Sequence, residues 1–221
     1  MRAVSLGTSV MLQALFVVSH GAEFNCKNSM ISDEWREKVL NVQNVNRQRL
    51  AQGKLVGKDN KLLPVAKDIN WLIWDCPLED AAYDLAVKCA EPVAAPAGHG
   101  AVAKMITAKS KPCNTTTTAV QAVKEIWKAG LAKQETQAKV ADNNDFSQMA
   151  YSKTNGVGCS YNWCTGKLFL VCLYNQDGAA QAITDLYTNG AAGETCETCA
   201  ATNTCVEWLC EVPITPGKDF I

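Results

Sequence analysis

The chain has 221 residues, 48% of them hydrophobic, and a formal net charge of −1. This balance of 21 basic and 22 acidic side chains argues against a basic face for nucleic acid. The 11 cysteines are the strongest signal in the composition. In an exported chain such a density indicates disulfides, and because the number is odd, one thiol must stay free or bond to another molecule.

Residues 1–21 have the pattern of a secretory leader. Arg2 supplies the positive start, and the apolar run 10–18 is too short to span a bilayer as a helix. Small residues at Ser19 and Gly21 predict cleavage after Gly21. No later segment is long and apolar enough to cross a membrane. We therefore expect a secreted, soluble product of about 200 residues, enough for one large domain and a small appendage.

Two helices are predicted in the first half of the chain. The first begins after Ser32, a good N-cap followed by acidic residues, and ends at Gly53. The second has Pro77 at its first position, and residues 78–89 form a one-sided apolar stripe. Both patterns are typical of helices that cover a core.

The middle of the chain carries a weaker pattern and then a third helix. Residues 91–111 are interrupted by Pro, Ala and Gly around His99, with one apolar patch at residues 105–106. The threonine run 115–118 is expected to cap the third helix, which closes at Gly130. Residues 131–141 are polar and predict a solvated turn.

Two strands follow. Residues 157–163 and 168–174 flank Cys164-Thr-Gly166, which is a compact hairpin signal. The second strand is nearly all apolar, so it should lie in a sheet that is covered on both faces. Helices before and between strands, without regular alternation, predict the α+β class.

The C-terminal segment changes character. Four cysteines follow the spacing Cys196-x2-Cys199-x5-Cys205-x4-Cys210. Four thiolates could close a zinc shell in a cytosolic protein, but the second pair is too widely spaced and the leader predicts an oxidising compartment. Disulfides are the favoured interpretation.

Six segments match motifs of a known family in order and spacing. They are residues 43–53, which resemble a His-Asn-x-x-Arg…Leu-Ala-x-Gly pattern with Gln43 in place of its histidine, 74–89, 122–127, 146–159, 171–190 and the four-cysteine tail. On these segments the chain resembles the CAP superfamily of cysteine-rich secretory, antigen five and pathogenesis-related-one proteins. It looks most like the activation-associated secreted proteins of parasitic nematodes. The resemblance implies a three-layer α-β-α sandwich over residues 22–190 and a cysteine-rich, hinge-like tail over residues 191–221.

The departures from the family pattern concern its cleft, where many members hold a divalent metal with two histidines and two glutamates. One expected histidine is Asp145, and the chain reads Ala-Glu-Pro-Val where the other would follow Cys89. The expected glutamates fall at Ala129 and, in a looser alignment, Ala101. The positions of this degenerate cleft are Gln43, Ala101, Ala129, Asp145 and Gln148.

The number of histidines shows whether the cleft could bind a metal in the family's way. His20 leaves with the leader, so His99 is the only histidine of the mature chain, and a cleft with two histidines cannot form within it. Imidazole and thiolate supply most zinc affinity, so we expect no metal, no cofactor and no catalytic residue. His99 could serve as a catalytic base, but no nucleophile stands at a recognisable spacing, which favours an exposed loop histidine.

The resemblance also implies disulfide pairings. These are Cys196–Cys205 and Cys199–Cys210 in the tail, and Cys159–Cys172, Cys76–Cys164 and Cys26–Cys89 in the main domain. Cys113 is left over, in a polar loop beside Lys109 and Lys111, which favour the reactive thiolate. We expect a Cys113–Cys113 disulfide homodimer, and the alternative is a free or small-thiol-capped cysteine.

Asn114-Thr-Thr is an N-glycosylation acceptor sequence on a polar loop of an exported chain. Trp71 and Trp74 could stack on a ligand, but core packing is favoured. The family resemblance implies a secreted, non-enzymatic binding protein, a parasite product that modulates host tissue or immunity through an unknown host partner. The alternative is a lipid or sterol carrier, because some family members bind such ligands between helices. A hydrolase or metal-dependent enzyme is least supported.

Overall fold

The computed structural model describes residues 24–107 and 114–213. The predicted leader and Cys113 therefore lie outside the described residues. The helices are α1 (Asp33–Ala51), the short 3-10 helix η1 (Lys58–Asn60), α2 (Cys76–Ala86), α3 (Thr115–Leu131) and α4 (Asn144–Ala150). The strands are β1 (Val65–Ala66), β2 (Ile73–Trp74), β3 (Gly100–Thr107), β4 (Gly156–Cys164), β5 (Lys167–Tyr174), β6 (Asn189–Gly190), β7 (Thr204–Val206) and β8 (Leu209–Glu211). None of the described helices is both long and apolar enough to cross a membrane.

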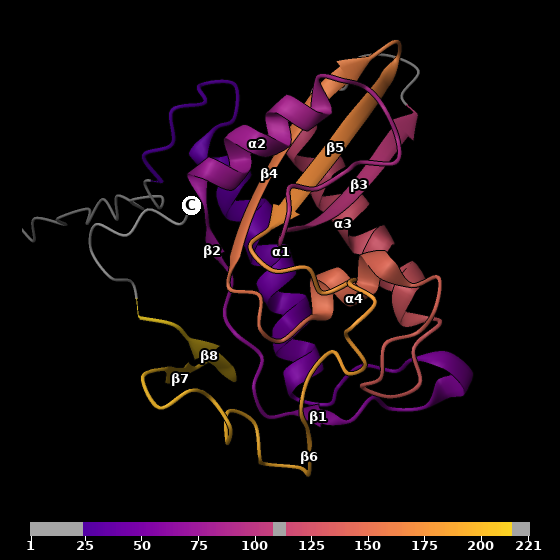
Figure 1. Cartoon of the computed structure of the whole chain (residues 1–221), viewed down its shortest axis with the longest axis vertical. Helices are drawn as coiled ribbons and strands as arrows, with labels where there is room; N and C mark the ends of the chain where they lie inside the picture. The colour runs from indigo at the N-terminus through magenta and orange to yellow at the C-terminus, as the bar shows by residue number, and fades with distance from the viewer. Residues whose placement is uncertain (1–23, 108–113, 214–221) are drawn as a thin grey trace, which may run out of the picture.

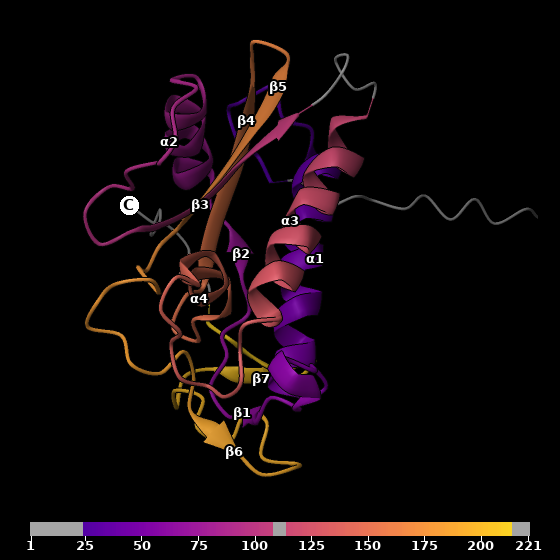
Figure 2. The ribbon, with the colours of Figure 1, turned by 90° about the vertical axis from the view of Figure 1, so that its right-hand side faces the viewer.

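A four-stranded sheet forms the middle layer, with strand order β2-β4-β5-β3. The short β2 runs parallel to β4, and the other pairs are antiparallel. Helix α2 packs on one face, while α1, α3 and α4 cover the other (Figures 1 and 2). The predicted three-layer α-β-α sandwich of the α+β class is confirmed.

Strand β5 shows why the second predicted strand is almost entirely apolar. Alternate residues of a strand point to opposite faces. Phe169, Val171 and Leu173 pack with α2, whereas Leu170 and Cys172 join the core beneath α1 and α3. Both sets of side chains are buried, so the prediction of a sheet covered on both faces is confirmed.

The helix starts follow N-capping chemistry, with two corrections to the predicted positions. Ser32 caps α1 as predicted, since its Oγ accepts a hydrogen bond from the Trp35 N–H at 3.2 Å. Helix α2 begins one residue before Pro77 because Asp75 is its cap. Helix α3 is capped by Asn114, whose Oδ1 accepts from the Thr117 N–H at 2.9 Å. The threonine run therefore forms the first turn of α3 and does not cap it.

Among the elements longer than three residues, β3 and α4 were not predicted. Strand β3 pairs with β5 over its whole length, from Gly100 opposite Tyr174 to Thr107 opposite Lys167. Helix α4 buries five consecutive residues, Phe146 to Ala150. An element that is buried on all sides has no apolar periodicity, so α4 left no helical pattern in the sequence.

Five disulfides are present among the described cysteines. Cys159–Cys172 joins directly opposed residues of β4 and β5, and the tail holds Cys196–Cys205 and Cys199–Cys210, which confirms these three predicted pairs. The other two pairings were wrong. The structure has Cys26–Cys76 and Cys89–Cys164 instead.

The direction of α2 explains this correction. The backbone from Asp75 to Glu79, at the start of the helix, lies against Gly158 near the start of β4. Cys164, at the end of β4, lies 3.8 Å from the carbonyl oxygen of Ala86 at the end of the helix. An 11-residue helix is about 16 Å long, so Cys76 and Cys164 lie at opposite ends of it. Cys164 therefore meets Cys89, just after the helix.

Two arginines of α1 are buried and bind distant parts of the chain. Arg36 donates from Nε and Nη2 to the two carboxylate oxygens of Glu79 at 2.6 and 2.7 Å, and Trp74 Nε1 donates to the same carboxylate at 2.7 Å. Arg47 donates to five backbone carbonyl oxygens, those of Asn70, Met149, Tyr151, Ser152 and Thr154. Trp71 and Trp74 pack against the core, as favoured from the sequence.

The tail is fastened to the body through β8. Leu209 is fully buried in the main core. The backbone of Cys210 donates to Ile69 O at 2.8 Å and accepts from the Trp71 N–H at 2.9 Å. The β7–β8 hairpin thereby lies at the lower end of α1, away from α2 (Figure 1).

Candidate functional site

A cavity of about 530 Å³ opens where the end of α3, the start of α4 and strand β3 meet. We call it the cleft. Two of the five predicted positions, Ala129 on α3 and Asp145 on α4, line it together. The complete lining is Ala103, Lys104, Glu125, Ile126, Ala129, Gly130, Lys133, Asp142, Asn143, Asn144 and Asp145.

The cations of the cleft are already engaged. Lys104 Nζ lies 2.8 Å from Glu125 Oε2, and Lys133 Nζ donates to the carbonyl oxygen of Asp142 at 2.9 Å. Asp145 makes no ion pair within the part of the chain that the structure describes. Although the residue is largely exposed, partial burial of its carboxylate raises its pKa, nearby Glu91 raises it further, and Lys133 opposes both.

Three predicted positions lie outside the cleft. Gln43 is buried in the core, where its Oε1 accepts from the Tyr174 hydroxyl at 2.6 Å and its Nε2 lies 3.8 Å from Cys159 Sγ. Ala101 packs with the side chains under α2. Gln148 bridges α4 to a loop, accepting from the Gly178 N–H and donating to Gln176 O, both at 2.9 Å. These side chains support the fold rather than a site.

Glu91 was not a predicted site residue, although it stands in the segment where the family's other histidine is expected. Its Oε1 accepts a hydrogen bond from the Met105 N–H of β3 at 3.2 Å. Its negative charge also raises the pKa of Asp145, so a second acid lies near the cleft. The sequence signal was its position two residues after Cys89.

His99 lies in the loop before β3. Its Nδ1 is 3.0 Å from Ala97 O, and the side chain is half-buried, which corrects the expectation of an exposed histidine. Its charge acts on Asp75, the N-cap of α2, rather than on the cleft. Burial raises the pKa of Asp75, while the Leu78 N–H and His99 lower it.

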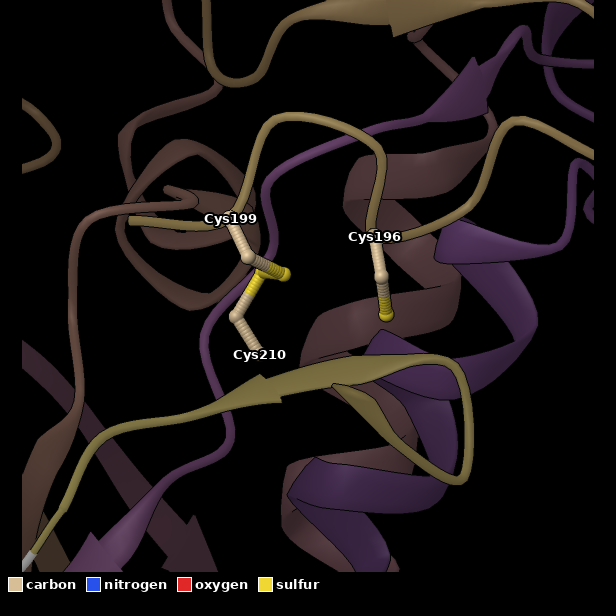
Figure 3. A group of neighbouring side chains, drawn as sticks. All are labelled: Cys196, Cys199 and Cys210. Carbon is tan, nitrogen blue, oxygen red and sulfur yellow. A yellow bond between two sulfur atoms is a disulfide. The ribbon is translucent and has the colours of Figure 1, made fainter. Parts of the chain in front are cut away.

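The donor set of the cleft does not fit a divalent metal. Across residues 24–107 and 114–213, the sole group of three or more potential ligand atoms lying within 4.8 Å of one another is Cys196, Cys199 and Cys210. Figure 3 shows Cys196 beside the Cys199–Cys210 disulfide. Cys196 is itself bonded to Cys205, so none of these sulfurs is a thiolate that could bind zinc.

A second cavity, of about 670 Å³, lies between α1 and α3, and the sequence analysis missed it. Its apolar lining includes Val42, Val45 and Leu131, and four cations, Lys38, Arg49, Lys124 and Lys128, also line it. Asn46 and Trp127 line it as well. Among the described residues, their buried Nδ2 and Nε1 donors have no hydrogen-bond partner. We call this cavity the α1–α3 groove.

The fold and the cleft define a disulfide-stabilised α-β-α sandwich with a cysteine-rich tail. Residues 40–174 match the family model described as CAP, the cysteine-rich secretory protein family, and the chain belongs to this family. The Ancylostoma secreted protein of Ancylostoma caninum is 32% identical over 161 residues, which cover 70% of this chain and 37% of that protein. The expected likeness to nematode secreted proteins is confirmed.

Solved structures agree on the fold. Na-ASP-1 superposes with a TM-score of 0.77 at 26% identity, covering 88% of this chain and 50% of that one. BmVAL-1 superposes with a TM-score of 0.73 at 24% identity, covering 86% of this chain and 100% of that one. NaASP2 with Zn²⁺ superposes with a TM-score of 0.71 at 22% identity, covering 84% of this chain and 99% of that one. The chain thus spans half or less of the Ancylostoma secreted protein and of Na-ASP-1.

Proposed function

We propose that this protein is a secreted CAP-type protein that acts by binding a host tissue or immune component, and not by catalysis. The observation that supports the proposal is the cleft. It keeps an open hollow of about 530 Å³ between β3, α3 and α4, while Ala129 and Asp145 stand where the family resemblance implies a glutamate and a histidine. An open, polar hollow without the metal-binding side chains suits recognition better than chemistry.

A cell-binding measurement tests this proposal. Fluorescently labelled, disulfide-intact protein is titrated onto platelets, leukocytes and endothelial cells, and the same preparation is assayed on ester, peptide and phosphate substrates. We expect saturable binding that unlabelled protein displaces and that reduction with alkylation abolishes, together with no turnover. Turnover that co-elutes with the folded protein, or the absence of saturable binding on all three cell types, would overturn the proposal.

Lipid carriage is the second candidate, and the α1–α3 groove favours it. An apolar lining with four cations and two unpartnered buried donors, Asn46 Nδ2 and Trp127 Nε1, suits an amphiphile with an anionic head. Native mass spectrometry and displacement of a fluorescent fatty acid measure it. Val45→Glu, inside the groove, should abolish fatty-acid binding, whereas Val56→Glu, at a similarly exposed valine that does not line it, should leave binding unchanged.

We further propose that residues 1–21 are a leader, that residues 22–190 form the main domain with residues 191–221 as its appendage, and that Asn114 is glycosylated. Asn114 is exposed, and its Oδ1 caps α3, so a glycan on Nδ2 leaves the cap intact. Peptide mapping of secreted protein measures this modification. The proposed Cys113–Cys113 homodimer is tested by non-reducing electrophoresis of the wild type against Cys113→Ser.

A further inference from the structure

Strand β3 is an edge strand with unused hydrogen-bonding groups. It pairs with β5 on one side, and the sheet order leaves its other side without a partner strand. The Met105 N–H donates to Glu91 Oε1 and hence points away from β5. Because N–H groups alternate along an antiparallel strand, those of Ala101 and Ala103 point the same way. Neither of them meets a hydrogen-bond acceptor among the residues that the structure describes.

This free edge borders the cleft. Ala103 and Lys104 line the cavity together with Ala129 and Asp145. Since the Ala103 side chain packs toward α2, its backbone is the part that faces the cleft. Figure 2 is viewed from the β3 side of the sheet, with α2 and α3 to either side of the strand and α4 below it. An incoming chain would therefore lie along β3, over the cleft.

The charge left over at this edge is negative. Lys104 is paired with Glu125, and Lys133 keeps its charge because it donates to a neutral carbonyl oxygen. The carboxylates of Asp142, Asp145 and Glu91 outnumber this one cation. Glu91 and Asp145 have no ion pair within residues 24–107 and 114–213, and Glu91 lies at the edge itself through its bond to β3. A partner with a basic side chain at this point would complement both carboxylates.

We propose that the free edge of β3 binds an extended peptide segment of a partner protein, with a basic side chain of that segment facing Asp145 and Glu91. The inference rests on the proposed binding function and assigns it a site. The N–H and C=O groups of Ala101 and Ala103 supply the main-chain hydrogen bonds that add a strand to the sheet. The two carboxylates supply the selectivity for a basic residue.

The experiment selects peptides on the full-length, disulfide-intact protein. The probe is a displayed library of random peptides of about ten residues, the upper end of common strand lengths. Enriched peptides are synthesised, and their affinity is measured by fluorescence polarisation. We expect strand-forming sequences with a central Lys or Arg, and replacement of that residue by Glu should weaken binding by about tenfold or more. Failure to enrich any peptide would overturn the proposal.

Protein variants locate the site. Ala103→Pro removes an outward N–H that the ladder with β5 does not use, a change that edge strands tolerate, and it should weaken binding by about tenfold or more. Ala103→Val keeps the N–H and should bind like the wild type. Asp145→Asn should lower affinity for basic peptides, whereas Asp84→Asn, which lies outside the cleft, should not.

Peptide variants provide the same test without changing the protein, in case Ala103→Pro does not fold. Alternate amides of a bound peptide point toward β3 or away from it. N-methylation of the amides that point toward β3 should abolish binding, and N-methylation of the others should preserve it. Equal binding by both methylated sets, or unchanged affinity in a folded Ala103→Pro variant, would overturn the site. If light scattering shows a dimer that Ala103→Pro dissociates, the occupant is a second copy and the partner-peptide proposal is wrong. Host-cell binding that survives Ala103→Pro would overturn this site alone and leave the proposed function standing.

Discussion

Helix α4 lies between two regions whose charged side chains differ: one is buried and fully hydrogen-bonded, and the other is exposed at the cleft. At its C-terminal end, Met149 O is one of five carbonyl oxygens bound by Arg47, which is 1% exposed. At its N-terminal end, Asp145 opens onto the cleft without an ion pair among the described residues. The Arg47 side chain holds loops of the fold together, whereas the Asp145 side chain forms no ion pair with any described residue. The family motif matches at Arg47 and departs at Asp145, so a departure at the cleft leaves the fold intact.

The strongest test of this contrast removes the buried guanidinium. Arg47→Met leaves several buried carbonyls without a donor, and because each such group costs roughly 1–3 kcal/mol, we expect a loss of at least about 3 kcal/mol. Guanidinium unfolding of disulfide-intact protein measures the loss. Arg49→Met, an exposed neighbour on the same helix, is the control and should change stability little. Equal losses in the two variants would contradict the contrast.

The second prediction concerns the buried pair of Arg36 and Glu79. Glu79 is 0% exposed and receives three hydrogen bonds, two from Arg36 and one from Trp74. Glu79→Gln keeps the shape but removes the charge, and hydrogen bonds to charged groups contribute roughly 1.5–3 kcal/mol, so we expect a loss of about 2–3 kcal/mol. Glu34→Gln breaks the exposed pair with Lys38 and should have no measurable effect on the same unfolding curve. A Glu79→Gln variant as stable as wild type would show that the pair is dispensable.

The sequence predicted the elements whose patterns are local. Ser32 followed by acidic residues predicted the start of α1, and Cys164-Thr-Gly166 predicted the β4–β5 hairpin, whose turn residues Thr165 and Gly166 both have positive φ. Strand β3 was missed because its alanines and glycine carry little strand propensity, and its pairing with β5 is a long-range contact that no local pattern shows.

The cleft was predictable only in part. Ala129 and Asp145 followed from the family resemblance and do lie together. Gln43, Ala101 and Gln148 were predicted in the same way but lie outside the cleft. Ala101 faces α2, because a one-residue change of register moves a strand side chain to the other face of the sheet. The two glutamines form hydrogen bonds inside the fold. Arg36 and Arg47 look like surface charges in the sequence, since burial of a charge depends on partners that are far away in the chain.

The third prediction concerns Asp75, the buried cap of α2. Its Oδ1 accepts from the Leu78 N–H at 3.0 Å, so Asp75→Ala should cost about 1 kcal/mol, whereas Asp75→Asn keeps an acceptor and should cost less. Burial raises the pKa of Asp75 from an ordinary value of 3.8, so the folded protein binds this proton more tightly than the unfolded chain does. This site therefore lowers stability as pH rises through the window just above 3.8. Urea unfolding of both proteins measures this effect as a difference: as pH rises through that window, the stability of the wild type should fall relative to that of Asp75→Asn. An identical pH profile in both proteins would contradict the assignment.

Metal binding tests the account of the cleft most directly. The measurement combines elemental analysis of purified protein with thermal melting in the presence of zinc, manganese or EDTA. The cleft has no thiolate or imidazole among its lining side chains, and no three of its carboxylates have oxygen atoms within 4.8 Å of one another. We therefore predict no stoichiometric metal, a zinc affinity no tighter than about millimolar, and a melting temperature that EDTA does not change. A stoichiometric metal that raises the melting temperature and is lost in Asp145→Asn would contradict the claim that this cleft is a binding surface without metal chemistry.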